Sequence, residues 1–256
     1  MNECLYIIKA VGDVLLPRTC IVCGCRLDVS EKYLCGKCEE DIPLTYNWQR
    51  KYHPIADRFN TVIQRDLVGY EPYSFVANLF FYDENNGYRH ICHLLKYHGN
   101  TGIGIHFGRR LGTCLAASPH FRNVDTVIPV PLHWKRYWSR GYNQAGIIGK
   151  AVASVLGAGF CPELLVRKKN TVSQTTLDNA GKHENMLEAF TVPKRVLYSN
   201  CNLPRLRRDG IRHILVIDDV FTSGATMAAC RSALRKVFPP EVRISVATLA
   251  AVDEDY

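Results

Sequence analysis

The chain has 256 residues, of which 47% are hydrophobic and 22% charged, a balance typical of a folded globular protein. No apolar run is long enough to cross a bilayer, and the apolar residues 1–16 lack the basic start and cleavage site of a secretory signal, so we expect a cytoplasmic protein without a membrane span. The formal net charge of +8 favours anionic partners, either nucleic acid or phosphorylated small molecules.

The N-terminal part combines a helical pattern with two cysteine pairs. Residues 4–16 have the spacing of a moderately amphipathic helix, which Pro17 ends. Two C-x2-C pairs follow, and each closes a turn that can direct two thiolates at one ion. The four predicted ligands are Cys20, Cys23, Cys35 and Cys38. Tetrahedral Zn²⁺ suits such a set; free or redox-active thiols are the alternative, and Cys25 is a spare thiol that could compete with Cys23.

We expect this zinc to be structural. The 11 cysteines are an odd number with one tight cluster, which argues for thiolate chemistry in a reducing compartment and against a disulfide scaffold. A closed Cys4 site leaves no open position for substrate or water, so catalysis would lie elsewhere. We therefore predict a zinc-ribbon module with its preceding helix at residues 1–42 and a main domain at residues 43–256, in which 43–123 form a connector or hood and 124–256 the core.

The connector begins with residues 43–68, which have little pattern and are interpreted as a linking segment with some helix. Apolar periodicity then predicts a strand over residues 75–82 and helices over residues 88–97 and 104–117. Lys96 stands near the end of the first of these helices. It is either simply solvated or placed to reach an anion.

The core is predicted to alternate strands and helices, which implies a parallel sheet with right-handed crossovers. Strands are expected at residues 124–130, 164–167, 213–217 and 242–249, with helical spacing through residues 147–155 and 227–238. A basic loop with Lys135, Arg136 and Arg140 follows the first strand, and a long polar arm follows the second. The sequence therefore predicts an α/β fold.

The stretch of residues 214–226 organises this core. Four apolar, mostly β-branched residues predict a buried strand, Asp218 and Asp219 follow, and a turn of small residues opens a helix. Such a turn offers N–H and hydroxyl donors with the helix dipole behind them, so it can hold a phosphate dianion. Gly224 lets the backbone approach the ligand closely. Adjacent carboxylates suit a diol, so the implied ligand is ribose with a phosphate at one end.

Two other phosphate-binding motifs are excluded. The turn lacks the Gly-Lys-Ser/Thr ending of a P-loop, and residues 102–107 fail the dinucleotide fingerprint at its third glycine. An ordinary strand-to-helix turn with solvated aspartates is the remaining alternative.

Residues 217–226 resemble the loop that binds phosphoribosyl diphosphate (PRPP) in type I phosphoribosyltransferases: a hydrophobic strand, Asp-Asp and Thr-Ser-Gly-x-Thr. The resemblance implies the type I phosphoribosyltransferase fold, with Asp218 and Asp219 acting at the ribose as the catalytic pair. It also implies a 5-phosphate site made by Val220, Phe221, Thr222, Ser223, Gly224, Ala225 and Thr226.

Residues 95–99, 127–144 and 167–190 further resemble the ComF branch of that superfamily. In such proteins the loop after the first core strand binds pyrophosphate, which here implies Pro131, Leu132, Arg136, Arg140, Gly141, Asn143 and Gln144. Arginine forks beside a helix start suit a diphosphate, although a basic surface loop is the alternative. The resemblance also implies a flexible arm that closes over PRPP, with Arg167, Thr171, Gln174, Lys182 and Asn185. Lys182 stands where the family usually has an arginine, and the basic segment 194–212 is interpreted as an insertion.

The resemblance covers nearly the whole chain and leaves two hypotheses. ComF proteins are associated with natural competence, the uptake of DNA in transformation. As an enzyme, the protein would transfer phosphoribosyl from PRPP to an unknown acceptor, with Mg²⁺ bridging the diphosphate. As a binding protein, it would sense PRPP or a nucleotide while the zinc module and basic arm engage single-stranded DNA or a competence helicase. Trp134, Tyr137 and Trp138 could stack bases or simply pack.

Overall fold

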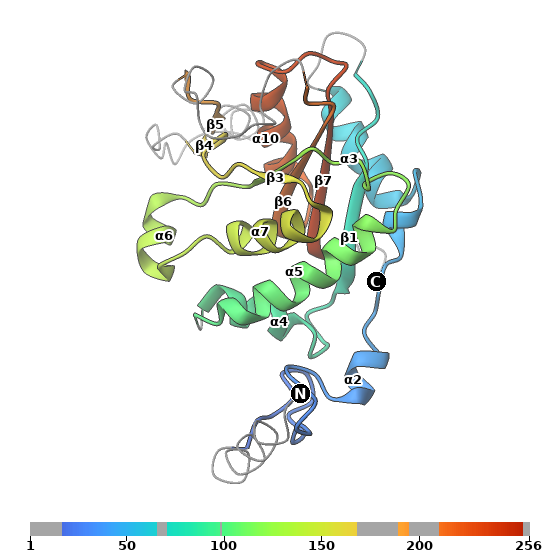
Figure 1. The fold of residues 1–256 in the computed structure, drawn as a ribbon, viewed down its shortest axis with the longest axis vertical. Helices are drawn as coiled ribbons and strands as arrows, with labels where there is room; N and C mark the ends of the chain where they lie inside the picture. The colour runs from blue at the N-terminus through green and yellow to red at the C-terminus, as the bar shows by residue number, and fades with distance from the viewer. Residues whose placement is uncertain (1–16, 66–70, 98, 168–188, 195–209, 253–256) are drawn as a thin grey trace.

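The computed structural model of the protein describes residues 17–65, 71–97, 99–167, 189–194 and 210–252 (Figure 1). The helix expected at residues 4–16 lies outside these ranges. So do four residues expected in the arm, Thr171, Gln174, Lys182 and Asn185, and most of the basic segment 194–212. These expectations stay predictions.

Five parallel strands form the central sheet in the order β1-β7-β6-β2-β3 (Figure 1). Their bounds are Val76–Tyr82 (β1), Thr126–Pro129 (β2), Gly159–Phe160 (β3), His213–Phe221 (β6) and Arg243–Val252 (β7). Every neighbouring pair runs parallel, with β6 paired to β7 on one side and to β2 on the other. The predicted α/β fold, a parallel sheet flanked by helices, is confirmed.

Helices cover both faces of the sheet. Their bounds are Pro54–Arg65 (α3), Arg89–Tyr97 (α4), Thr101–Ala116 (α5), Gln144–Leu156 (α7) and Ala225–Arg235 (α10). One core joins α4, α5 and α7 to Leu215 and Ile217, and a second joins α3 and α10 to Ile214 and Val216. Successive side chains of a strand point to opposite faces, so the apolar run at the start of β6 contributes to both cores.

A row of glycines brings α5 close to α7. A Cβ atom at Gly104 would lie 2.9 Å from Cγ2 of Ile147, and one at Gly108 would lie 3.0 Å from the carbonyl oxygen of Ile148. Real Cβ atoms rarely approach other atoms this closely, so the two helices can pack at this separation only with glycine at these positions.

The acidic pair lies inside a strand, whereas the sequence predicted that the strand ends at residue 217. β6 continues to Phe221 because β7 pairs with it to the end, with Val220 beside Ala250 and Phe221 beside Ala251. Asp218 and Asp219 are therefore held by the sheet and not by a loop, which fixes their backbone rigidly.

The basic segment after β2 is a short helix, α6 (Trp134–Arg140), where the sequence predicted a loop. The His133 side chain accepts a hydrogen bond from the backbone N–H of Lys135 at its start. Gly141 ends the helix with a φ of 77°, in the left-handed region that glycine favours. No residue of α6 is buried, so the helix lacks the apolar stripe that periodicity would detect.

The strand expected at residues 164–167 is also different. Only Val166–Arg167 (β4) is extended, and it pairs antiparallel with Phe190–Thr191 (β5) in a separate two-stranded sheet. The place beside β2 in the central sheet is taken by β3 instead. These strands have two residues each, too few for a hydrophobic pattern to distinguish.

The cysteine-rich segment packs against the α4–α5 layer (Figure 1). It contains the short helix α2 (Gly36–Glu40). The Tyr88 hydroxyl donates to the backbone carbonyl of Cys38 at 2.9 Å, the ring of Tyr33 contacts that of His106, and Arg110 forms an ion pair with Glu39. The segment shares a hydrophobic cluster with α4 and α5, so the packing does not mark a domain boundary after residue 42. The boundary expected there stays a prediction.

Candidate functional site

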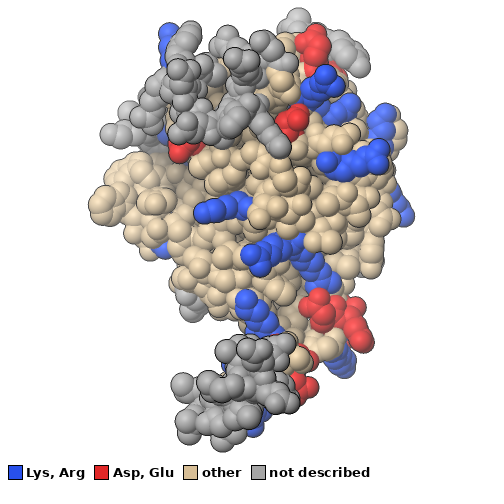
Figure 2. All heavy atoms as spheres, in the orientation of Figure 1, with Lys and Arg blue, Asp and Glu red and all other residues tan. Residues whose placement is uncertain are grey.

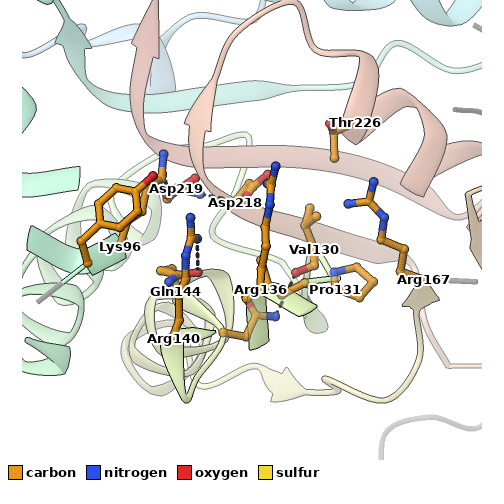
Figure 3. A pocket seen from close by; sticks show the side chains of 13 residues that line it. Lys96, Val130, Pro131, Arg136, Arg140, Gln144, Arg167, Asp218, Asp219 and Thr226 are labelled. Carbon is orange, nitrogen blue, oxygen red and sulfur yellow. Dashed lines mark hydrogen bonds and ion pairs between the residues drawn. The ribbon is translucent and has the colours of Figure 1, made fainter. Parts of the chain in front are cut away.

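A polar pocket of about 320 Å³ opens near the carboxyl ends of β2 and β6 (Figure 3). This edge of a parallel α/β sheet is where ligands commonly bind. The pocket is lined by Lys96, Tyr97, Val130, Pro131, Leu132, Arg136, Arg140, Asn143, Gln144, Arg167, Asp218, Asp219 and Thr226. Four segments far apart in the sequence thus contribute to one cavity: the end of α4, the β2–α7 connection, β4, and β6 with the start of α10.

The pocket brings together many of the residues predicted from the sequence, and others lie outside its lining. Those outside it are Gly141, Val220, Phe221, Thr222, Ser223, Gly224 and Ala225. The Phe221 side chain is buried against Phe59, so only its backbone is available to a ligand. Thr222 and Ser223 are exposed at the turn. The roles of all these residues stay predictions.

The two carboxylates of β6 differ in their surroundings. The backbone N–H of Asp219 donates to Oδ1 of Asp218 at 2.9 Å, and the Asp219 carboxylate forms an ion pair with Lys96. Asp218 has some exposed surface in the pocket, but protein surrounds its carboxyl group, and this burial, together with the charge of Asp219, raises the pKa of Asp218 to about 8. At neutral pH the pair therefore carries about one negative charge.

Lys96 stabilises that charge. Its Nζ lies 3.1 Å from Oδ2 of Asp219. Burial alone would lower the pKa of Lys96, yet the charge of Asp219 and the hydrogen bond to it outweigh burial and raise this pKa. Two buried thiols nearby, Cys92 and Cys230, stay neutral because burial raises the pKa of each.

Cations face the acidic pair across the pocket. Figure 3 shows Arg136 and Arg140 reaching from α6 toward the two aspartates, with Arg167 entering from β4. Arg140 donates to Oε1 of Gln144 at 3.1 Å. Among the residues that the structure describes, Arg136 and Arg167 have no carboxylate partner. Burial, and then the nearby charge of Arg136, lower the pKa of Arg167, as expected for cations that lack a counter-charge.

Gln144 adds an unused hydrogen-bond donor. Its side chain is 3% exposed, and its Nε2 has no hydrogen-bond partner within the described part of the chain. A buried amide group without a partner is unfavourable, so this atom is suited to an oxygen of a bound ligand. Asn143, next to it, is already engaged and donates to the backbone carbonyl of Val130.

The small-residue turn after β6 is held in one conformation. Gly224 has a φ of 77° directly before α10, and a Cβ atom there would lie 2.8 Å from the Phe221 ring. Arg58 of α3 donates to the backbone carbonyl of Thr222 at 2.9 Å. The turn therefore presents the start of α10 beside Thr226, which lines the pocket.

The four predicted zinc ligands form a cluster. The sulfur atoms of Cys20, Cys23, Cys35 and Cys38 all lie within 4.8 Å of one another, and those of Cys23 and Cys35 are 3.7 Å apart. A tetrahedral zinc ion with bonds of about 2.3 Å to sulfur separates its ligands by about 3.8 Å. The cluster therefore fits a structural metal ion such as zinc, and Cys25 lies outside this set.

Three residues that line the pocket were not among the predicted site residues: Lys96, Tyr97 and Val130. Lys96 stands in a sequence segment with a family resemblance, but nothing in its spacing pairs it with Asp219. The packing of α4 against the sheet creates that pairing. Such long-range contacts leave no local periodic signal.

Fold and site together define a parallel α/β protein with an acidic and basic pocket at its strand ends and a four-cysteine cluster near its N-terminus. The chain is 29% identical over 240 residues to competence protein F of Haemophilus influenzae, covering 91% of this chain and 92% of that protein. The resemblance to the ComF family that the sequence predicted is thus confirmed over nearly the whole chain.

Other matches cover shorter segments. The DNA utilization protein YhgH of Escherichia coli O157:H7 is 30% identical over 144 residues, which are 54% of this chain and 56% of YhgH. YhgH of Salmonella typhi is 29% identical over 104 residues, 41% of this chain and 40% of that protein. No family model matches the chain. Within the described ranges, no helix has both the length and the apolar character that crossing a membrane requires.

Proposed function

We propose that the protein binds PRPP in the pocket at the ends of β2 and β6 and acts in the handling of DNA during its uptake or use. One observation carries the ligand assignment: a single cavity places the Asp218–Asp219 pair opposite Arg136, Arg140 and Arg167. A ligand with a diol and several phosphate charges satisfies both sides of such a cavity. The biological setting follows the names of the relatives, competence protein F and DNA utilization protein.

Each part of PRPP has a chemical counterpart in the pocket. The ribose hydroxyls would donate to the carboxylates of β6, and the 5-phosphate would accept from Thr226 and the start of α10. The diphosphate would lie against Arg136 and Arg140, where the unpartnered Nε2 of Gln144 offers a further donor.

Transfer from PRPP would need positioning and charge stabilisation more than a covalent nucleophile. An acceptor attacks the anomeric carbon while the bond from that carbon to the diphosphate oxygen breaks, and pyrophosphate leaves with the electron pair. The arginines would stabilise the leaving charge, and the β6 carboxylates would hold the ribose in place. Carboxylate oxygens are also suitable ligands for Mg²⁺, which supplies further charge neutralisation at a diphosphate when bound.

Release of pyrophosphate tests the enzyme function directly. Zinc-loaded protein is incubated with PRPP and Mg²⁺ against a panel of nucleobases and amines. We expect release with at least one acceptor, and a loss of at least about tenfold in Arg136→Met, because a hydrogen bond to a charged group is removed from the leaving side. Lys150→Met, an exposed change on α7, serves as the matched control. A protein that binds PRPP yet releases no pyrophosphate with any acceptor would contradict the enzyme function.

A second candidate is a non-catalytic protein that senses PRPP or a nucleotide and binds single-stranded DNA. The exposed aromatic residues of α6 favour it, because Trp134 and Tyr137 are each 51% exposed and Trp138 is 83% exposed. They flank Lys135 and Arg136 in the sequence, and aromatic and basic residues together can stack bases and neutralise phosphates. Figure 2 also shows Lys and Arg side chains across the middle of the face that α5 and α7 form.

DNA binding is tested by fluorescence anisotropy with a labelled oligonucleotide across a salt series. If DNA binding depends on the cations of α6 and of residues 167–169, the affinity falls steeply as the salt concentration rises. On a single strand, each neutralised phosphate adds about 0.7 to the slope of log K against log salt concentration. Trp138→Ala should weaken binding at every salt concentration without changing the slope, because it removes stacking and no charge. Undetectable binding at low salt would exclude this candidate.

A further inference from the structure

Lys96 is the cation that occupies the acidic side of the pocket before any ligand does. It extends from the last turn of α4, and its ammonium lies 3.1 Å from Oδ2 of Asp219 (Figure 3). The two side chains are 28% and 13% exposed, so the ion pair is largely removed from water. Of the cations that line the described pocket, only Lys96 forms an ion pair with a carboxylate.

A neutral diol competes poorly with this ion pair. A diol that engages both oxygens of Asp219 must displace the ammonium from Oδ2, and hydrogen bonds from neutral hydroxyls are weaker than those that involve a charged donor and a charged acceptor. The displaced ammonium would stay partly buried without a counter-charge, which is costly. A sugar that brings only hydroxyl groups to this side of the pocket therefore gains little binding free energy there.

Among the residues that line the described pocket, Lys96 has no second anion with which it could form an ion pair. Asp218 is mostly protonated at neutral pH, because burial and the charge of Asp219 raise its pKa to about 8. Burial also raises the pKa of Cys92, which keeps that thiol neutral. Arg136 and Arg140 on the facing side are cations themselves. A counter-charge that releases Lys96 must therefore come from the ligand.

We propose that Lys96 is a specificity-determining residue that requires a diol and a diphosphate on the same ligand. It releases Asp219 to the ribose hydroxyls only when the diphosphate replaces that carboxylate as its partner. The inference rests on the proposed function and deepens it, because it explains how the pocket selects PRPP over a sugar phosphate with the same ribose. Ribose 5-phosphate has the diol and the 5-phosphate but no diphosphate, so it cannot release Lys96.

Calorimetric titration with PRPP and with ribose 5-phosphate, at neutral pH with Mg²⁺, measures this selectivity. The wild type should prefer PRPP, and Lys96→Met should reduce the ratio of the two affinities by at least about tenfold. Two changes lower that ratio together. The affinity for ribose 5-phosphate rises because Asp219 is free to bind it, and the affinity for PRPP falls because a cation is lost. Lys96→Gln keeps a hydrogen-bond donor for Asp219 without the charge, so it should shift the ratio in the same direction. It replaces the methionine variant if that variant is unfolded.

Lys150→Met is the matched control, because this exposed lysine of α7 does not line the pocket, and it should leave the ratio unchanged. Folded Lys96 variants that keep the wild-type preference would overturn this inference alone, with the proposed function intact. A wild type without measurable affinity for PRPP would overturn the proposed function and this inference with it.

Discussion

The pKa of Asp218 depends on the burial and the charges of the pocket around it. Its carboxyl group is buried beside another carboxylate, and both effects disfavour its charged form. In the unfolded chain the same group would ionise near its ordinary pKa of 3.8, far below the value of about 8 in the fold. Between these two values the unfolded state is ionised and the folded state is protonated, so this residue makes the protein less stable as pH rises.

Asp218→Asn should remove that pH dependence. The protonated group contributes its full stability below pH 3.8, and this contribution is lost as pH rises through about 8. Across this window the free energy of unfolding of the variant therefore increases relative to that of the wild type. We expect its advantage in free energy of unfolding to be larger at pH 8 than at pH 5 by at least about 1 kcal/mol. Denaturant titration of both proteins at the two pH values measures this. An advantage independent of pH would show that Asp218 is ionised in the fold.

Among the elements, the α5–α7 pair depends on glycine, because the helices approach each other through it. Gly108→Ala should destabilise the fold by about 1 to 3 kcal/mol, since the added methyl group would lie 3.0 Å from backbone and side-chain atoms of α7 that cannot easily move. The higher helix propensity of alanine, worth about 1 kcal/mol, opposes this only in part. Thermal unfolding monitored by circular dichroism gives the difference.

Gly146→Ala in α7 separates close packing from helix propensity. A Cβ atom there would be 3.5 Å from its nearest neighbour, an ordinary contact, so this variant should be as stable as the wild type or more so. Equal effects of the two substitutions would contradict the role assigned to the contact at Gly108.

Elements with a strong apolar period were predictable from the sequence, and those without one were not. The start of β6 and the helix α10 follow from the run 214–217 and the spacing of buried residues after Gly224. The helix α6 buries none of its residues, so its pattern resembled a loop. The continuation of β6 through the acidic pair depends on β7 as a partner, and a partner strand is invisible to a local pattern.

The same distinction applies to the site. The β6 carboxylates and the arginines of α6 were predicted because they belong to contiguous motifs, and the structure places them around one pocket. Lys96 was not assigned to the site because its contact with Asp219 joins residues more than a hundred positions apart. Thr222 and Ser223 belong to the motif, yet they are exposed at the turn and do not line the pocket.

For the molecule as a whole, the cysteine cluster supports one end of the core. Cys38→Ser should abolish zinc binding and unfold residues 17–42, because structural zinc sites contribute about 10 kcal/mol or more to folding. The contact of Tyr88 with the backbone of Cys38 should be lost as well, which loosens the α4 layer. Metal analysis and hydrogen exchange measure the two effects.

Cys25→Ser is the control for this substitution. Cys25 is not one of the four residues of the ligand set, so this variant should keep one zinc ion per chain and unchanged exchange in residues 17–42. Loss of zinc in Cys25→Ser with retention in Cys38→Ser would assign the fourth ligand to Cys25.

The central claim is that the pocket at the ends of β2 and β6 binds PRPP, and calorimetric titration of the zinc-loaded protein with PRPP and Mg²⁺ tests it most directly. We expect one site per chain, with binding abolished in the double variant Asp218→Ala, Asp219→Ala while its circular dichroism spectrum stays that of the wild type. Loss of the ion pair between Asp219 and Lys96 costs some stability, and removal of the buried Asp218 carboxyl group offsets part of that cost. Unchanged affinity in the folded double variant, or no binding by the wild type, would contradict the account.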